Sequence, residues 1–270
     1  LGYYSRARNL KKAANQIMQD YHGVFPDTYD GILGLSGVGP YTAGAVSSIC
    51  FDMPVPAVDG NVLRVYSRLT CDSRCVDEQS VKADITRKLR DIYVNHLPEG
   101  EGRCGMLTQA LMELGATVCV PNGVPRCAGC PLKDICLAQA QNQAAELPVR
   151  RKKKERRREY YTVFLMEYDQ CFAIRKRPES GLLAGLWEFP HAEGTLEVQE
   201  ALDHVSAWGV QAEEVYSKRN CSHIFTHIEW HMTCIHMRVK SMPEGFHWVT
   251  MEQLQKEAAL PTAFRICMPK

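Results

Sequence analysis

The sequence predicts a two-domain protein in which an all-α domain precedes an α+β domain. A chain of 270 residues is long enough to form two cores. Up to about residue 145, apolar residues recur with the period of an amphipathic helix. From residue 161 they alternate with polar residues, which is typical of strands. The basic run RRKKKERRR at 150–158 lies between the two patterns, so a linker is predicted at 146–160, between domains at 1–145 and 161–270.

Three apolar stripes predict helices in the first domain, and stripes of this kind are expected to form its core. Their members are Leu10, Ala13, Ala14, Ile17 and Met18; Val81, Ile85, Leu89 and Ile92; and Leu107, Ala110, Leu111 and Leu114.

Residues 35–39, LSGVG, are predicted to form a tight hairpin between two helices. The two glycines permit positive φ and close backbone approach. Pro40 then stands where a helix begins, a position at which its missing N–H costs nothing. Such a hairpin presents backbone N–H groups and a helix N-terminus, which together accept a phosphate. The predicted contacts to a nucleic-acid backbone are Leu35, Gly37, Val38 and Gly39.

Asp59 lies in VDGNV and is predicted to be the N-cap of the next helix. The simplest role of an Asp at this position is to accept backbone N–H bonds. A second role uses the same geometry, because a carboxylate held by a helix N-terminus stays anionic and can face a developing cation. Asn61, in the same turn, is a candidate DNA contact.

Twelve cysteines are spread along a chain without a secretion signal, which favours free thiols and one metal site over a disulfide scaffold. Four of them have the spacing C-x7-C-x2-C-x5-C, without the two separated CxxC pairs usual for zinc. A compact loop of four thiolates can hold a [4Fe–4S] cluster. The predicted ligands are Cys119, Cys127, Cys130 and Cys136. The other eight cysteines are expected to be small core or surface residues.

The motif LxGVGxxTAxA followed by VDGNVxRV resembles the helix-hairpin-helix glycosylases of the endonuclease III superfamily, and most closely the adenine DNA glycosylases of the MutY family. Further matches are LGYYSRARNL at 1–10, QALMELGATVC at 109–119 and GLLAGLWEFP at 181–190, so the resemblance covers nearly the whole chain. It implies removal of adenine mispaired with 8-oxoguanine or guanine, after the base is flipped out of the duplex. It also implies a [4Fe–4S] cluster at C-x6-C-x2-C-x5-C, and this chain has one extra residue in the first gap.

The resemblance gives expected roles to several residues. Asp59 would stabilise or trap the oxocarbenium ion left when adenine departs. The general acid is a Glu ahead of LGYY, and is therefore expected upstream of Leu1. Tyr41 stands where endonuclease III-like lyases carry a Schiff-base Lys, so a monofunctional enzyme is expected. Tyr3 would stack near the mispair, and Arg6 is a candidate phosphate contact.

In the second domain, strands are predicted at 161–168 and 171–175 with a turn at 169–170, a strand through 228–234, and a helix at 195–208. This domain resembles the MutT-like domain of adenine glycosylases. The REUxEE box of true Nudix hydrolases is missing, because no Arg occurs between Arg177 and Arg219. Recognition is therefore expected here, with Phe225, Thr226 and His227 meeting 8-oxoguanine; Thr226 replaces the family's Ser.

The expected partner is double-stranded DNA containing A:8-oxoguanine mispairs, bound by a monomer. A net charge of +1 does not oppose this, because the basic residues cluster in one run that would lie along phosphates. No apolar run approaches the roughly 18 residues of a membrane span. The expected location is the cytoplasm of a bacterium, or the nucleus or mitochondrion of a eukaryote. Two alternatives stay open: an endonuclease III-like glycosylase/lyase, and a non-catalytic DNA-binding module.

Overall fold

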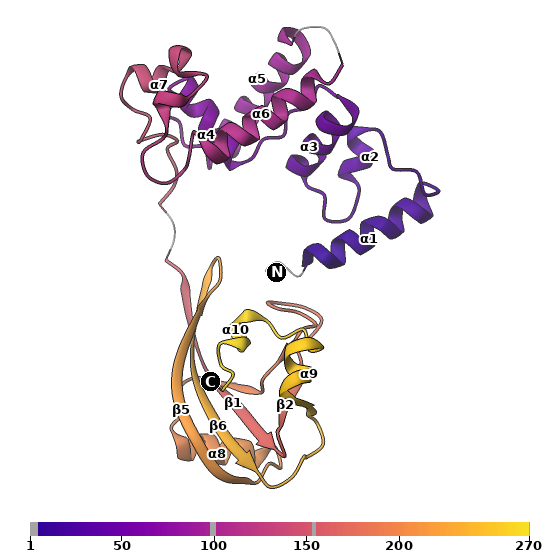
Figure 1. The fold of residues 1–270 in the computed structure, drawn as a ribbon, viewed down its shortest axis with the longest axis vertical. Coiled ribbons are helices and arrows are strands. Elements are labelled where there is room, and N and C mark those ends of the chain that lie inside the picture. Colours follow the sequence, from indigo (N-terminus) through magenta and orange to yellow (C-terminus); the bar gives the residue numbers. More distant parts are fainter. Residues whose placement is uncertain (1–4, 98–100, 153–154, 270) are drawn as a thin grey trace. The chain divides into compact units, whose positions relative to one another are not determined.

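The computed structural model describes residues 5–97, 101–152 and 155–269. It divides into two compact units between Lys152 and Lys153, inside the predicted linker. Within the described residues, the first unit contains helices and no strands, and the second contains the sheet (Figure 1). This confirms the predicted order of an all-α part and an α+β part. None of the helices in the described ranges is long and apolar enough to cross a membrane.

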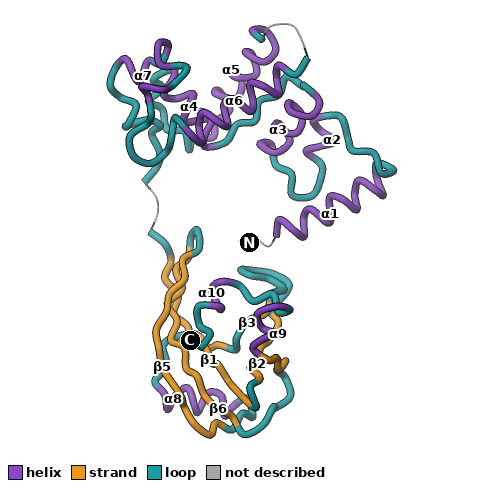
Figure 2. The backbone as a smooth tube through the Cα atoms, viewed as in Figure 1, coloured by secondary structure: helices purple, strands orange, loops and turns teal. Residues whose placement is uncertain are grey.

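The first unit, called the helical unit, is built from short helices joined by loops (Figure 2). Its α-helices are α1 (Ser5–Asp20), α2 (Tyr29–Leu33), α3 (Pro40–Phe51), α4 (Gly60–Leu69), α5 (Gln79–Asp91), α6 (Arg103–Thr117) and α7 (Leu137–Ala140). A π-helical turn, η1 (Ile92–His96), extends α5, and two 3-10 turns, η2 (Cys127–Gly129) and η3 (Lys133–Ile135), lie in the cysteine loop. The predicted helix-hairpin-helix is present as α2, the 34–39 loop and α3.

The apolar stripe of α5 packs as predicted against α4. Val81, Ile85 and Leu89 are at most 5% exposed and share a core with Val62 and Leu63. The stripe ends sooner than predicted, because Ile92 in η1 is 37% exposed.

The predicted core face of α6 is only partly confirmed, since Leu111 packs against the core of α4 and α5. Ala110 is exposed and the leucines of the stripe are half-buried, whereas the buried residues are Cys104, Gly105, Thr108 and Gly115. The reason is close helix packing against α3 and α4. A Cβ on Gly105 would lie 3.0 Å from the Ser48 carbonyl oxygen, so α6 presents small residues where the backbones meet.

The stripe of α1 forms a helix, but its predicted core role is wrong. Leu10 is 74% exposed and Met18 is 67% exposed, while Ala13 alone of the stripe is buried. In the described residues, α1 contacts the 34–39 loop through polar side chains instead. Gln16 Oε1 accepts a hydrogen bond from the Ser36 N–H at 2.7 Å.

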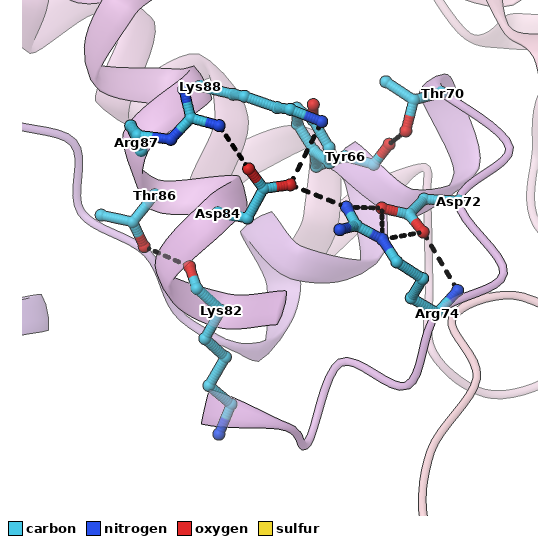
Figure 3. A network of polar contacts seen from close by, with 9 residues as sticks. All are labelled: Tyr66, Thr70, Asp72, Arg74, Lys82, Asp84, Thr86, Arg87 and Lys88. Carbon is cyan, nitrogen blue, oxygen red and sulfur yellow. Dashed lines mark hydrogen bonds and ion pairs between the residues drawn. The ribbon is translucent and has the colours of Figure 1, made fainter. Parts of the chain in front are cut away.

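Ion pairs join the 70–78 loop, which follows α4, to α5 (Figure 3). Arg74 Nη2 lies 2.6 Å from Asp72 Oδ2 and 2.9 Å from Asp84 Oδ2. Arg87 Nη2 and Lys88 Nζ also contact Asp84, at 2.6 and 3.2 Å. The hydrogen bond from Arg74, followed by those from Arg87 and Lys88, holds the pKa of Asp84 well below its usual range. The network fixes the loop at the surface, where such pairs stabilise only modestly.

The second unit, called the sheet unit, contains a seven-stranded mixed sheet of order β3-β2-β1-β6-β5, with β4 paired to β1 and β7 to β2. Its strands are β1 (Arg157–Tyr168), β2 (Cys171–Lys176), β3 (Trp187–Glu188), β4 (His191–Glu193), β5 (Ala212–Ile224), β6 (Ile228–Val239) and β7 (His247–Thr250). Its helices are α8 (Val198–Ala207), α9 (Met251–Lys256) and α10 (Thr262–Arg265). The β1–β2 turn is at 169–170 as predicted, but β1 begins four residues before the predicted start at 161.

Each face of the sheet has its own core, because β1 and β6 carry apolar side chains on both faces. Phe164 and Met237 lie in one core with Ala201 and Val205 of α8. Val163 and Trp230 lie in the other with residues of α9, α10 and the C-terminal segment. Near-continuous apolar runs are typical of strands buried on both faces.

Candidate functional site

The 35–39 hairpin ends in a helix N-terminus that no side chain caps. Gly39 is the N-cap of α3 in extended conformation, without a side-chain hydrogen bond, and Pro40 follows at the first helical position. Gly37 has φ of 78° and is exposed, as the hairpin requires. Leu35 is only 4% exposed, so its side chain anchors the hairpin and does not reach the surface, and its carbonyl accepts the Val38 N–H at 3.0 Å.

Asp59 is the N-cap of α4, as predicted. Its Oδ1 accepts hydrogen bonds from the backbone N–H groups of Asn61 and Val62 at 2.8 and 2.9 Å. Its Oδ2 accepts a third bond from Asn61 Nδ2 at 3.0 Å. These bonds fix the carboxylate at the positive end of the helix dipole. Arg150, the first residue of the basic run, lies nearby, since a Cβ on Gly60 would be 3.2 Å from its Nη2.

Asn61 is held between Asp59 and a buried arginine. Its amide oxygen accepts a hydrogen bond from Arg64 Nη2 at 2.9 Å while its Nδ2 donates to Asp59. Its Cβ packs against α6, because a Cβ on Gly115 would lie 2.8 Å away. The structure therefore places Asn61, predicted as a DNA contact, in the group that positions the Asp59 carboxylate.

Two buried arginines one turn apart on α4 were not predicted. Arg64 Nε donates to the Cys119 carbonyl at 2.7 Å, and its Nη2 donates to the Gly115 carbonyl at 2.6 Å. Arg68 Nε donates to the Leu147 carbonyl at 2.8 Å, and its Nη1 donates to Cys119 Sγ at 3.2 Å. The available signal was an Arg pair at i and i+4 on the helix GNVLRVYSRL. Its carbonyl partners are 51 to 79 residues away, so the pattern alone could not identify them.

Tyr41 and Asp59 lie within electrostatic reach of each other. Partial burial, together with the negative charge of Asp59, raises the pKa of Tyr41. The α3 helix also approaches the segment before Asp59 closely, since a Cβ on Gly44 would lie 2.6 Å from the Pro56 carbonyl oxygen. The hairpin helix and the Asp59 turn are thus packed directly together, a contact that sequence reasoning missed.

The four predicted cluster cysteines line one cavity, together with Arg68, Val118 and Lys133. Desolvation, followed by the charges of Cys136, Cys119 and Cys130, raises the pKa of Cys127. Four free, converging sulfurs beside a buried arginine fit a thiolate-bound cluster, whose negative charge Arg68 would offset. The first gap contains an exposed turn at Gly123, whose φ is 76°, and such a turn can absorb an extra residue.

The predicted contacts of the sheet unit lie in the turn between β5 and β6. The Phe225 N–H donates to the Ile228 carbonyl at 2.8 Å and closes the turn. Phe225 is half-buried and packs edge-on against Trp230, with ring centroids 4.9 Å apart. Thr226 and His227 are exposed. The turn therefore offers two polar side chains on an aromatic base.

The two remaining predicted contacts belong to the N-terminal segment. Tyr3 lies outside the described residues. Arg6 is exposed on the first turn of α1, where a phosphate contact stays a prediction.

Comparison with known proteins gives the same division of the chain. The family model described as the helix-hairpin-helix motif matches residues 20–49, and the NUDIX domain model matches residues 161–270. An adenine DNA glycosylase of Mus musculus is 30% identical, over 98% of this chain and 61% of the relative. An adenine DNA glycosylase of Arabidopsis thaliana is 33% identical, over 84% of this chain and 40% of the relative. The chain therefore spans less than two thirds of the length of either relative.

Proposed function

We propose that the chain belongs to the adenine DNA glycosylase family and acts in base-excision repair by hydrolysing the N-glycosidic bond of adenine mispaired with 8-oxoguanine. The observation that supports this most directly is the Asp59 carboxylate, fixed by three hydrogen bonds beside the hairpin helix. A base buried in a duplex stack must first be flipped out to reach such a group.

The proposed chemistry depends on the charge of Asp59. Departure of adenine leaves cationic character on the sugar, and a preorganised carboxylate stabilises that charge or traps it covalently. Tyr41 supports a monofunctional reaction, because a phenol cannot form the imine through which a lyase acts.

DNA binding is proposed through the hairpin and the basic run. The uncapped N-terminus of α3 supplies backbone N–H donors suited to a phosphate. Arg150 adds a cation near the start of α4. The Phe225, Thr226 and His227 turn is proposed to meet 8-oxoguanine, with the exposed hydroxyl and imidazole as hydrogen-bonding groups.

A [4Fe–4S] cluster is proposed as the resident cofactor of the four-cysteine cavity. Cys119, Cys127, Cys130 and Cys136 would hold it, and it would give the 119–136 loop a fixed structure. Through the Cys119 carbonyl and sulfur, that loop is bonded to Arg64 and Arg68 of α4, the helix that Asp59 caps.

The test compares excision and mispair affinity in the full-length protein carrying either Asp59→Asn or a Phe225→Ala/Thr226→Ala double change. Asp59→Asn should cut single-turnover excision by about two orders of magnitude or more and leave mispair affinity nearly unchanged. The double change should weaken the preference for 8-oxoguanine over guanine opposite adenine, with residual excision of the plain mispair.

Asp91→Asn, an exposed carboxylate of the same unit, is the matched control and should behave as the wild type. If Asp59→Asn slows excision only in proportion to lost stability, Asp59 is a cap alone. If the double variant keeps its full preference for 8-oxoguanine, the recognition role of the turn is wrong.

A further inference from the structure

Three cysteines from three separate segments of the sheet unit meet at one point, apart from the four-cysteine loop of the helical unit. Cys221 lies on β5, Cys234 on the neighbouring strand β6, and Cys267 just after α10. Cys221 Sγ is 3.3 Å from Cys234 Sγ and 3.5 Å from Cys267 Sγ, and all three sulfurs lie within 4.8 Å of one another. Cys234 and Cys267 are fully buried, and Cys221 is half-buried.

We propose that Cys221, Cys234 and Cys267 form a binding site for a thiophilic metal ion of the Zn²⁺ class, with water in the fourth position of the ion. Zinc is held by thiolates at about 2.3 Å, which places tetrahedral ligands about 3.8 Å apart. The two shortest sulfur separations are within half an ångström of that value, so little movement is needed to close the sulfurs around one ion.

The strand register argues against a disulfide between the two closest cysteines. Cys221 faces Met232 across the ladder, and Cys234 faces Arg219, so the two cysteines are diagonal neighbours. Diagonal positions place Cα atoms about 7–8 Å apart, at or beyond the limit for a disulfide without backbone movement. A metal ion bridges such a pair without that movement, because each sulfur bonds to the ion and not to the other sulfur.

The charge around the sulfurs also suits a metal. Arg219 places a positive charge near Cys221, and this charge would offset the net negative charge of three thiolates around Zn²⁺ once their protons are released. Arg219 also donates a hydrogen bond to the Met268 carbonyl, which ties the segment carrying Cys267 to β5.

The three sulfurs leave the fourth position of a tetrahedral ion to water. The nearby His223 is not in the group whose ligand atoms lie within 4.8 Å of one another. It follows Cys221 by two residues on β5, and alternate residues of a strand share a face. Both side chains are half-buried while their neighbours Ser222 and Ile224 are exposed. His223 pairs with Trp230 and Cys234 pairs with Arg219, so the two residues lie on opposite sides of the Cys221–Met232 pair.

The site lies at the base of the turn that carries Phe225. The His223 and Phe225 rings pack edge to face, with centroids 4.7 Å apart. An ion bound to Cys221 would therefore lie two residues along β5 from the ring against which Phe225 packs.

The experiment titrates Zn²⁺ into the reduced, anaerobic full-length chain in competition with a chromogenic chelator. Cys221→Ser is compared with Cys171→Ser, a half-buried cysteine of β2 outside the site. The wild type and Cys171→Ser should bind one more tight equivalent than Cys221→Ser. Because the four-cysteine loop is present in all three chains, its own zinc uptake cancels. Equal stoichiometry in all three would overturn the proposal.

A second measurement needs no variant. Peptide mapping after alkylation should show Zn²⁺ slowing modification of Cys221 by about tenfold or more, as expected of a metal-bound thiolate, without slowing that of Cys171. Unchanged reactivity of Cys221 would identify the three thiols as core residues. A Cys221–Cys234 disulfide formed in air with no zinc protection would equally contradict the site.

Discussion

Replacing Gly115 by Ala tests whether the close approach of α6 to α4 positions the Asp59 carboxylate. The new Cβ would lie 2.8 Å from Asn61 Cβ and 3.5 Å from Asn61 Cα. Carbon atoms prefer separations of about 3.5–4.0 Å, so α4 must move by several tenths of an ångström. The obstruction is the root of a side chain and cannot rotate away.

Two opposing effects set the change in stability. Alanine favours the helix by about 1 kcal/mol over glycine. Overpacking costs about 1–3 kcal/mol. The expected net loss is about 1 kcal/mol, which lowers the melting temperature by about 2–4 °C in a unit of this size.

The effect on excision should exceed the effect on stability, because Asn61 also holds Oδ2 of Asp59. Misplacement of a reacting group by about 1 Å costs about a hundredfold, so a smaller shift should slow single-turnover excision about tenfold. Thermal unfolding and single-turnover excision of the full-length protein check both values. The control is Ala110→Ser, at an exposed position of the same helix. The reasoning would be refuted if the Gly115→Ala protein had the melting temperature of the wild type and excised adenine at the wild-type rate.

Four further predictions concern other parts of the two units. Glu188→Ala should lower the free energy of unfolding by about 3 kcal/mol in urea titration, because Glu188 is 2% exposed and its loss leaves two arginines unpaired; Glu179→Ala, at an 80% exposed site, should change it little, and equal effects would contradict this. Burial lowers the pKa of His191 below its usual 6.5. The unfolded chain therefore takes up the proton first, and the free energy of unfolding should fall as pH drops below about 6.5. His191→Gln should flatten this pH dependence, and an unchanged pH dependence in that variant would contradict the prediction. Borohydride should trap no imine at residue 41, because a phenol cannot form one. Efficient trapping that is lost in Tyr41→Phe would contradict the proposed monofunctional reaction. Anaerobically purified protein should be brown and contain about four irons per chain in the four-cysteine loop; stoichiometric zinc without iron would exclude the cluster.

Features encoded by neighbouring residues were predictable from the sequence. The hairpin needs glycines followed by Pro40, and the Asp59 cap bonds to residues two and three positions ahead, so both signals are local. The α+β character of the sheet unit followed from alternation along the chain. The inward face of α6 was not predictable, because it depends on how closely α6 approaches α3 and α4, and there Gly105 and Gly115 matter more than leucine.

The long-range partners of several side chains could not be predicted from the sequence either. The carbonyls bound by Arg64 and Arg68 come from parts of the chain whose side chains give no sign of the contact. The cysteines of the sheet unit are unremarkable in sequence, since Cys221, Cys234 and Cys267 have no regular spacing. Only the register of β5 with β6 and the position of the C-terminal segment bring them together.

The bond from Arg68 to the Leu147 carbonyl decides where the two units can be separated for study. A fragment ending at residue 145 would remove that acceptor and leave a guanidinium group buried beside the cysteine loop. It would also remove the Val149 carbonyl, which accepts the Val76 N–H at 3.0 Å, and the Arg151 N–H, which donates to Asp77 at 3.0 Å. The segment at 146–152, although it reads as linker, is thus the last structural piece of the helical unit, and a dissection that respects it cuts after Lys152.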